Sequence, residues 1–376
     1  MKVKETLAQL VAIDSVSSRS NLQIIEFLTQ RCSALGFSIQ RYSYQDENGL
    51  EKVNMVALLG TDFSAPPQIE LALVGHTDTV PYDPNWAEAK SLTERDGKLY
   101  ARGSCDTKGF IAAALTAVES VELTRLQRPL ALIFTADEEI GLLGAKHLAE
   151  LKPFRAKYSI VGEPTSLVPI RAGKGYSLAE VIVRGREAHS AYPALGASAI
   201  FRAARLITRI ESLGVQLREQ QHDAFDPPFT TVNVGLIKGG SAKNVIAGQC
   251  RFTVEWRPIP SQPSDHFLSL LTTAITDEKL IDPDFECEVV AGRADAGFET
   301  SLDSSLVLLL ERATGFKAST VAFGTEAAQM TRLGSESVVI GPGDIREAHR
   351  TGEFVPVKEL ERCVEVLTHA ITSLCF

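Results

Sequence analysis

Imidazole and carboxylate side chains recur where apolar runs end in this sequence. They lie in GHTDTVP (residues 75–81), RGSCDTKG (102–109), TADEE (135–139), GEPTS (162–166) and, late in the chain, at His349. In an open α/β sheet, ligands collect where the carboxyl ends of strands meet. Charged groups at the ends of buried strands are costly unless they are paired or bind a metal. Nitrogen and oxygen donors without cysteine suit zinc, with manganese or cobalt as substitutes.

Each of these residues, taken alone, also has an ordinary structural explanation. Asp106 precedes a predicted helix and could simply be its N-cap. The pair Glu138-Glu139 could be a solvated turn. Several such positions occurring together at strand ends and helix starts indicate a site, whereas one of them alone does not.

Helices and strands alternate in the segments that would position these side chains. Helical periodicity covers Asn21–Leu35, Gly109–Val121 and Gly141–Leu151, and buried strands are predicted at Ile69–Gly75, Leu130–Ala136 and Tyr158–Gly162. The same texture returns late in the chain, with helices over Asp303–Thr314 and Val357–Leu374 and a strand over Ser337–Ile340. This alternation predicts an α/β fold, a mixed sheet with helices on both faces.

The middle of the chain has a different texture, with strands that alternate between apolar and polar residues. Strands are expected near 177–185, 230–240, 249–258 and 285–291, with helices near 197–213 and 264–275. This order predicts an inserted two-layer α+β domain of the ferredoxin-like sort. We therefore expect residues 1–175 and 292–376 to form one α/β domain that is interrupted by an inserted domain of residues 176–291. The family resemblance described below implies that the first is a catalytic metal-binding domain and the second a dimerisation and lid domain.

Composition excludes several classes of protein. The 376 residues suggest about two domains, and 44% hydrophobic residues argue against intrinsic disorder. The 38 basic and 47 acidic residues give a net charge of −9, which disfavours nucleic acid as a partner. No apolar stretch resembles a secretory signal or a membrane span. The six cysteines are scattered without a CxxC pair, as expected of reduced thiols in the cytoplasm.

The motifs together resemble those of the di-zinc aminoacylase/carboxypeptidase family, which includes succinyl-diaminopimelate desuccinylase-like enzymes. The resemblance rests on GHTDTVP, RGSCDTKG, TADEE and GEPTS with the late His349, and it covers nearly the whole chain. Within the family, GKLYARG, GEPTSLVPIRAGKG, FGTEA and GPGDIREAH are most similar to the deacetylases of N-acyl amino acids.

The resemblance implies a role for each residue at the strand ends. His76 and Glu163 would hold one metal, Glu139 and His349 the other, and Asp106 would bridge the two. Asp78 would accept the second imidazole N–H of His76 and orient the ring. Glu138 would be the general base, which takes a proton from water and delivers it to the leaving amine.

The inserted domain and a late loop carry further implied site residues. His189, in the segment Glu187-Ala188-His189-Ser190, would reach the active site of a partner subunit and stabilise the tetrahedral oxyanion. Arg257 could clamp a substrate carboxylate, although an ordinary surface arginine is the alternative. Further substrate contacts are expected from Asn244 and from Thr325 and Glu326 in FGTEA.

The resemblance implies a cytoplasmic, homodimeric, zinc-dependent amidohydrolase that removes an N-acyl group from an amino acid. N-Acetylornithine is the leading expected substrate, and its hydrolysis would supply ornithine for arginine biosynthesis. Acetylcitrulline, succinyl-diaminopimelate and dipeptides are alternative substrates. A non-catalytic binding protein on the same fold is an alternative of a different class, but the presence of Glu138 and all five implied ligands argues against it.

Overall fold

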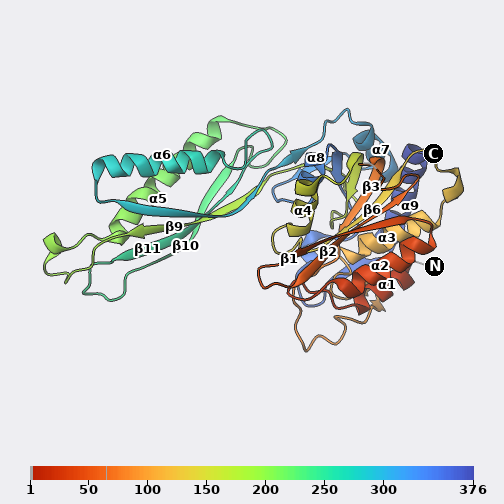
Figure 1. Cartoon of the computed structure of the whole chain (residues 1–376), viewed down its shortest axis with the longest axis horizontal. Coiled ribbons are helices and arrows are strands. Elements are labelled where there is room, and N and C mark those ends of the chain that lie inside the picture. Colours follow the sequence, from red (N-terminus) through yellow and green to blue (C-terminus); the bar gives the residue numbers. More distant parts are fainter. Residues whose placement is uncertain (1–2, 65) are drawn as a thin grey trace. The chain divides into compact units, whose positions relative to one another are not determined.

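The computed structural model describes residues 3–64 and 66–376, and the chain divides into two units (Figure 1). Unit 1 comprises Met1–Arg171, Glu299–Ser319 and Thr325–Phe376, and unit 2 comprises Ala172–Phe298 and Thr320–Gly324. The predicted catalytic domain includes residues 1, 2 and 65, which lie outside the described residues. The chain passes between the units within β8 (Ile170–Gly173), β13 (Phe298–Glu299) and β14 (Ser319–Val321), and again after Gly324.

A mixed sheet forms the centre of unit 1. Its strand order is β1-β2-β6-β3-β7-β15-β8-β13, and β14 pairs with β8. The strands within unit 1 are β1 (Ser38–Gln45), β2 (Glu51–Leu59), β3 (Gln68–His76), β6 (Leu130–Thr135), β7 (Arg155–Val161) and β15 (Glu336–Val339). The four strands β6, β3, β7 and β15 are parallel, whereas β1, β2 and β6 pair in antiparallel fashion. The predicted mixed sheet is confirmed.

Helices cover both faces of this sheet (Figure 1). One apolar core is shared by α1 (Val3–Ala12), α2 (Leu22–Ala34), α3 (Lys108–Glu119), α7 (Ser305–Thr314) and α9 (Val357–Cys375). Two further helices, α4 (Leu143–Leu151) and α8 (Ala327–Arg332), pack together, α4 against β2 and α8 against β7. Because side chains alternate along a strand, Leu71 and Leu73 of β3 join the first core and Ala72 and Val74 face the other side.

Unit 2 is a four-stranded antiparallel sheet, with strand order β10-β11-β9-β12, covered by two helices. Its elements in chain order are β9 (Tyr176–Arg184), α5 (Ala199–Gln216), β10 (Thr231–Gly239), β11 (Gln249–Arg257), α6 (His266–Ile281) and β12 (Glu286–Asp295). Apolar residues of the sheet and of α5 and α6 share one core, which includes Trp256 and Phe267. This βαββαβ order confirms the predicted ferredoxin-like architecture.

Several short elements complete the fold. A three-stranded sheet joins β4 (Thr93–Arg95), β5 (Lys98–Tyr100) and β16 (Phe354–Pro356). Single turns of 3-10 helix occur at Leu123–Arg125, Pro193–Leu195, Leu217–Glu219 and Ile345–Glu347. Across residues 3–64 and 66–376, no helix combines the length and the apolar character needed to cross a membrane.

The hairpin of β1 and β2 is an element for which the sequence analysis gave no expectation. Strand β1 reads SIQRYSYQ and is exposed or half-buried along its whole length, so it lacks a continuous apolar run. Strand β2 is buried over most of its length but carries the polar residues Lys52 and Asn54, both inaccessible to solvent. Its sequence is therefore unlike the apolar runs of β3 and β6.

Candidate functional site

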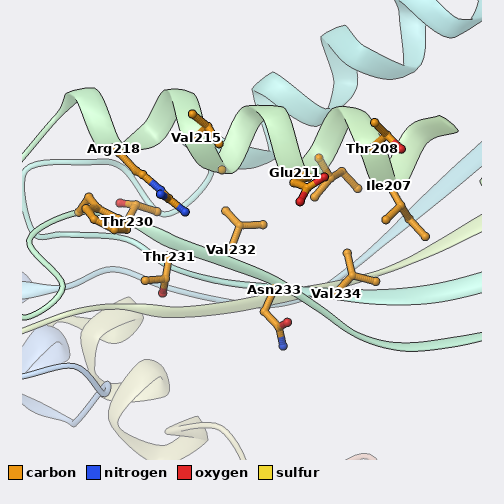
Figure 2. Close-up of a pocket in the computed structure, with 13 residues that line it drawn as sticks. Ile207, Thr208, Glu211, Val215, Arg218, Thr230, Thr231, Val232, Asn233 and Val234 are labelled. Atoms are coloured by element: carbon orange, nitrogen blue, oxygen red, sulfur yellow. The ribbon is translucent and has the colours of Figure 1, made fainter. Parts of the chain in front are cut away.

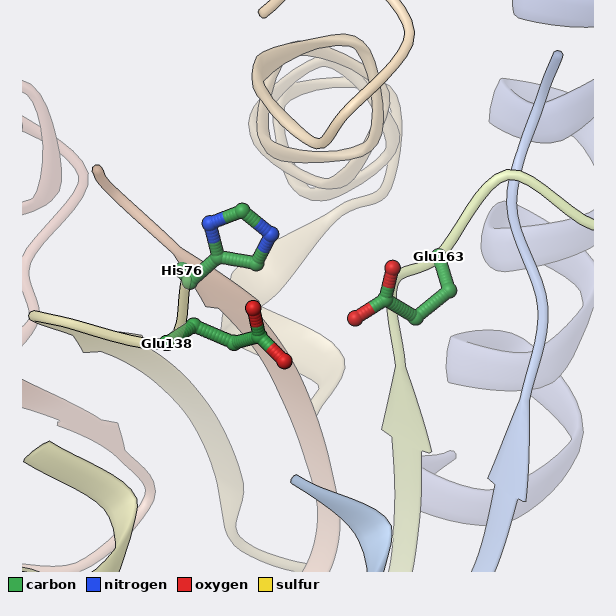
Figure 3. A group of neighbouring side chains, drawn as sticks. All are labelled: His76, Glu138 and Glu163. Carbon is green, nitrogen blue, oxygen red and sulfur yellow. The ribbon is translucent and has the colours of Figure 1, made fainter. Parts of the chain in front are cut away.

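The site forms where three neighbouring parallel strands end. β3 lies between β6 and β7, so residues that follow these strands meet at one edge of the sheet. His76 closes β3, Glu138 follows β6, and Glu163 follows β7. Figure 3 shows these three side chains converging, and each offers a ligand atom within 4.8 Å of the others.

Asp106 and Glu139 join the same cluster through His76. The His76 Nε2 atom lies 3.0 Å from Asp106 Oδ1, and His76, Asp106 and Glu139 form a second group with ligand atoms within 4.8 Å of one another. Asp106 stands two residues before α3, and its peptide bond to Thr107 is cis. His76 thus belongs to both groups, and Asp106 contacts it directly.

His349 reaches the cluster from the turn after the 3-10 helix Ile345–Glu347. Its Nε2 atom lies 3.1 Å from Asp106 Oδ2 and 3.0 Å from Glu139 Oε2. Its backbone is left-handed, with φ of 59°, and half of its side chain is exposed. All five residues that the sequence analysis named as metal ligands thus lie together in unit 1.

Asp78 lies beside His76 and also binds the turn that carries Glu138. The His76 Nδ1 atom lies 3.1 Å from the main-chain carbonyl of Asp78, whereas the carboxylate is 3.6 Å away. The buried carboxylate makes its shorter contacts elsewhere. It accepts hydrogen bonds from Ser17 Oγ at 2.8 Å, from the Glu138 amide at 3.1 Å and from the Glu139 amide at 3.3 Å. Asp78 therefore fixes the backbone of the turn that carries Glu138.

The cluster concentrates negative charge away from water. Burial, together with neighbouring carboxylates, raises the pKa of Glu138 and of Glu163 well above the ordinary value. Hydrogen bonds that its ring donates to Asp106 and Glu139 raise the pKa of His349 to about 10. Burial lowers the pKa of His76, but the hydrogen bonds that its ring donates to Asp106 and Asp78 outweigh burial and raise the pKa well above the ordinary value. A cluster of four carboxylates and two imidazoles held this closely has the donor atoms and the unbalanced charge that suit divalent cations.

Glu353 is a further site residue that the sequence analysis missed. Its buried Oε1 atom accepts hydrogen bonds from the Cys105 amide at 2.9 Å and from the Asp106 amide at 3.1 Å. Arg102 donates to its other oxygen at 2.5 Å. Glu353 thus fixes the backbone at Asp106 from almost 250 positions away in the chain. No local motif around Glu353 indicated this role.

Thr325 and Glu326 are buried in unit 1 and do not form an exposed loop. The Glu326 side chain is inaccessible to solvent, and its Oε1 atom accepts a hydrogen bond from Thr135 at the end of β6. Its Oε2 atom has no hydrogen-bond partner among the described residues. Burial raises the pKa of Glu326 to about 7. Thr325 Oγ1 accepts a hydrogen bond from the Ala327 amide at the start of α8.

His189, Asn244 and Arg257 belong to unit 2. His189 and Asn244 are both exposed and lie in adjoining segments, since the Ser190 amide donates to the Asn244 carbonyl at 3.0 Å. The Arg257 guanidinium lies over the Tyr176 ring, 4.7 Å from its centroid, and donates to the Ala322 carbonyl at 3.2 Å. These three side chains thus belong to unit 2, whereas the implied metal ligands belong to unit 1.

Unit 2 also contains a hollow of about 500 Å³ between α5 and β10 (Figure 2). Aliphatic side chains such as Ile207, Val215 and Val232 line it together with Glu211 and Arg218. Histidine is absent from the residues that line the hollow, whereas the cluster in unit 1 contains two histidines. The hollow adjoins the outer strand of the sheet, because β10 is paired on one side only, with β11.

Comparison with known proteins confirms the family resemblance. The model of Peptidase family M20/M25/M40 matches residues 72–373. The chain is 54% identical to acetylornithine deacetylase of Myxococcus xanthus, covering 99% of this chain and 97% of that protein. It is 34% identical to acetylornithine deacetylase of Proteus mirabilis, covering 99% and 96%. A tripeptidase structure from Staphylococcus aureus matches with a TM-score of 0.78 and 23% identity, over 99% of this chain and 97% of that chain. The chain belongs to Peptidase family M20/M25/M40.

Proposed function

We propose that this protein is a metal-dependent hydrolase that cleaves the amide bond of N-acetylornithine to give ornithine and acetate, as a step of arginine biosynthesis in the cytoplasm. The observation that carries the reaction class is the convergence of imidazole and carboxylate donors around Glu138 at one edge of the sheet. The substrate is supported by full-length relatives that are acetylornithine deacetylases, one of them 54% identical.

The donor set fits two divalent cations, zinc by preference with cobalt or manganese as substitutes. His76 and Glu163 would hold one, Glu139 and His349 the other, and Asp106 would be shared. Such cations polarise an amide carbonyl and lower the pKa of the attacking water. The crowding of buried carboxylates supports this assignment, because that charge needs compensation.

Glu138 carries the proton through the reaction. It accepts a proton from the attacking water as the water oxygen bonds to the carbonyl carbon. It then delivers that proton to the amine nitrogen as the carbon–nitrogen bond breaks, leaving acetate and ornithine. Asp78 supports this role by holding the backbone amides of Glu138 and Glu139. Glu353 gives Asp106 the corresponding support.

The inserted domain, residues 176–291, would make a homodimer and supply His189 to the partner's site. The outer strand β10 exposes Leu236 at 72% and Ile237 at 58%, and α5 exposes Phe201 at 72%. An unpaired strand edge with exposed apolar side chains favours pairing with another chain. His189 is itself exposed and would be free to donate to a developing oxyanion. Residues 1–175 and 292–376 would form the catalytic domain.

Four further residues would contact the substrate. Arg257 is held by Tyr176 and the Ala322 carbonyl and would receive the substrate carboxylate. Asn244 would contact the substrate near His189, and Thr325 would shape the pocket. Glu326 has a free carboxylate oxygen among the described residues, which suits the side-chain ammonium of N-acetylornithine.

A deacylation panel tests the proposal. The zinc-loaded protein would be assayed with N-acetylornithine, N-acetylcitrulline, N-acetylmethionine, succinyl-diaminopimelate and a tripeptide. We expect the largest kcat/KM with N-acetylornithine, with ornithine and acetate formed in equal amounts. A larger kcat/KM with any other member of the panel would contradict the substrate, and inactivity on all of them would contradict the reaction.

A further inference from the structure

Two residues of the hairpin of β1 and β2 donate hydrogen bonds to the turn that carries Glu138. Tyr44 and Lys52 stand opposite each other in the antiparallel register of the two strands. Both donate to Asp137, the residue immediately before Glu138. Lys52 Nζ lies 2.7 Å from one carboxylate oxygen and Tyr44 Oη lies 2.8 Å from the other. Asp137 is fully buried and has a left-handed backbone, with φ of 55°.

Lys52 is almost completely buried, with a side chain that is 1% exposed. Its ammonium also donates to the main-chain carbonyls of Ser17 and Arg19. Three acceptors therefore use its three N–H groups, and the burial of the charge is matched by the Asp137 carboxylate. This arrangement locks two separate segments, one around Ser17 and one at Asp137, onto the same strand.

Both segments are connected by hydrogen bonds or by the chain itself to the turn that carries Glu138. Ser17 donates through Oγ to Asp78, which in turn accepts from the amides of Glu138 and Glu139. Asn54 lies two residues after Lys52 on β2, and its side-chain oxygen accepts a hydrogen bond from the Ala136 amide at 3.0 Å. Contacts that depend on β2 thus hold the turn at Ala136, at Asp137 and at the two glutamates that follow.

We propose that Lys52 is a positioning residue for amide hydrolysis, which fixes Glu138 through Asp137 directly and through Ser17 and Asp78 indirectly. The inference rests on the proposed function, in which Glu138 moves the proton. Lys52 does not touch the substrate. Its contribution is to keep the Glu138 carboxylate within reach of the attacking water, where a displacement of about 1 Å can cost roughly 100-fold in rate.

The test compares Lys52→Met with Arg41→Met, which removes an exposed cation from the same hairpin. For Lys52→Met we expect kcat per metal-loaded subunit to fall roughly 10- to 100-fold, with KM within about threefold of wild type. Arg41→Met should leave both unchanged. A purely structural role would lower the melting temperature but not kcat per loaded subunit, so a wild-type kcat in Lys52→Met overturns the inference.

A readout without catalysis separates this inference from the proposed function. Hydrogen–deuterium exchange in the metal-free protein should be faster at the amides of Glu138 and Glu139 in Lys52→Met than in wild type or Arg41→Met. Unchanged exchange there would overturn the inference even if wild type hydrolyses none of the N-acyl amino acids. Wild-type inactivity on the substrate panel would contradict the proposed function, and the exchange result would still decide the role of Lys52.

A second variant keeps the test decisive if Lys52→Met does not fold, since it leaves the Asp137 charge buried without its partner. Lys52→Met/Asp137→Asn removes both charges and keeps an acceptor for Tyr44. We expect this double variant to fold and still to lose kcat, because the contacts of Lys52 with Ser17 and Asp137 are absent. Wild-type kcat and exchange in the double variant would overturn the inference.

Discussion

The implied site residues of the two units lie in opposite surroundings. In unit 1, the side chains around Glu138 are largely buried, and each is held by several partners, as Asp78 and Glu353 illustrate. In unit 2, His189 and Asn244 are exposed and are connected mainly through the backbone. Buried networks are organised before substrate arrives, whereas exposed groups acquire their geometry from a ligand or a partner. The preorganised network belongs to unit 1, so the proposed reaction is assigned to that unit, and the predictions below test what unit 2 contributes.

The largest expected effect lies in unit 1. Glu138→Gln should lower kcat by roughly 10²- to 10⁴-fold, because it removes proton transfer while its amide oxygen and nitrogen occupy the same space. Metal content measured by elemental analysis should stay at the wild-type value. Near-normal turnover with full metal content would remove Glu138 from the mechanism.

The comparison predicts a somewhat smaller loss when the unit 2 histidine is removed. His189→Ala should lower kcat by about 10²- to 10³-fold, since it removes one donor to the oxyanion. Metal binding should be unaffected, because His189 belongs to the other unit.

Subunit mixing then tests whether His189 acts in the partner's site. When His189→Ala and Glu138→Gln subunits exchange freely, half of the dimers are mixed and one of their two sites is intact, so roughly a quarter of wild-type activity should return. Verified mixed dimers without recovered activity would mean that His189 acts within its own chain or not at all.

A loss in metal affinity is expected when Asp78 is replaced. Asp78→Asn should weaken metal binding by about 10- to 100-fold, because it neutralises the carboxylate that lies beside His76 and holds the amides of Glu138 and Glu139. Competition with a chromophoric chelator measures this directly. An unchanged affinity together with an unchanged kcat would show that the hydrogen bonds of Asp78 are dispensable.

The smallest expected effect concerns specificity. Glu326→Gln should reduce the preference for N-acetylornithine over N-acetylcitrulline by roughly tenfold, because a charged hydrogen bond to the ammonium is lost and the neutral side chain of citrulline does not need one. The ratio of kcat/KM for the two substrates measures the change. A ratio equal to that of wild type would remove Glu326 from substrate selection.

Much of the fold could be predicted from sequence because its core strands are marked by continuous apolar runs. The runs at Ile69–Gly75 and Leu130–Ala136 are continuously apolar, and the structure has β3 and β6 there. The parallel pairing of these strands brings their polar ends to one edge, so the named ligands meet although they are distant in sequence. The strands of unit 2 could also be predicted, because apolar and polar residues alternate along them.

The supporting residues could not be predicted, for a physical reason. Lys52 and Glu353 are buried polar side chains whose roles depend on partners far away in the chain, such as Asp137 and Asp106. Neither has a local spacing that distinguishes it from a surface residue, and β1 lacks an apolar run. The role expected for Asp78 beside His76 also did not include the hydrogen bonds that its carboxylate accepts from the amides of Glu138 and Glu139. The metal identity, the roles of the site residues, the domain boundaries and the homodimer remain predictions.

Stepwise metal titration of the protein in the presence of N-acetylornithine tests the central claim most directly. Protein stripped by a chelator would receive zinc in small increments, while ornithine release and bound metal are measured on the same samples. The account predicts no turnover without metal and activity that rises until two zinc ions are bound per chain. Ornithine release by the metal-free protein, or none from chains that hold two zinc ions, would contradict it.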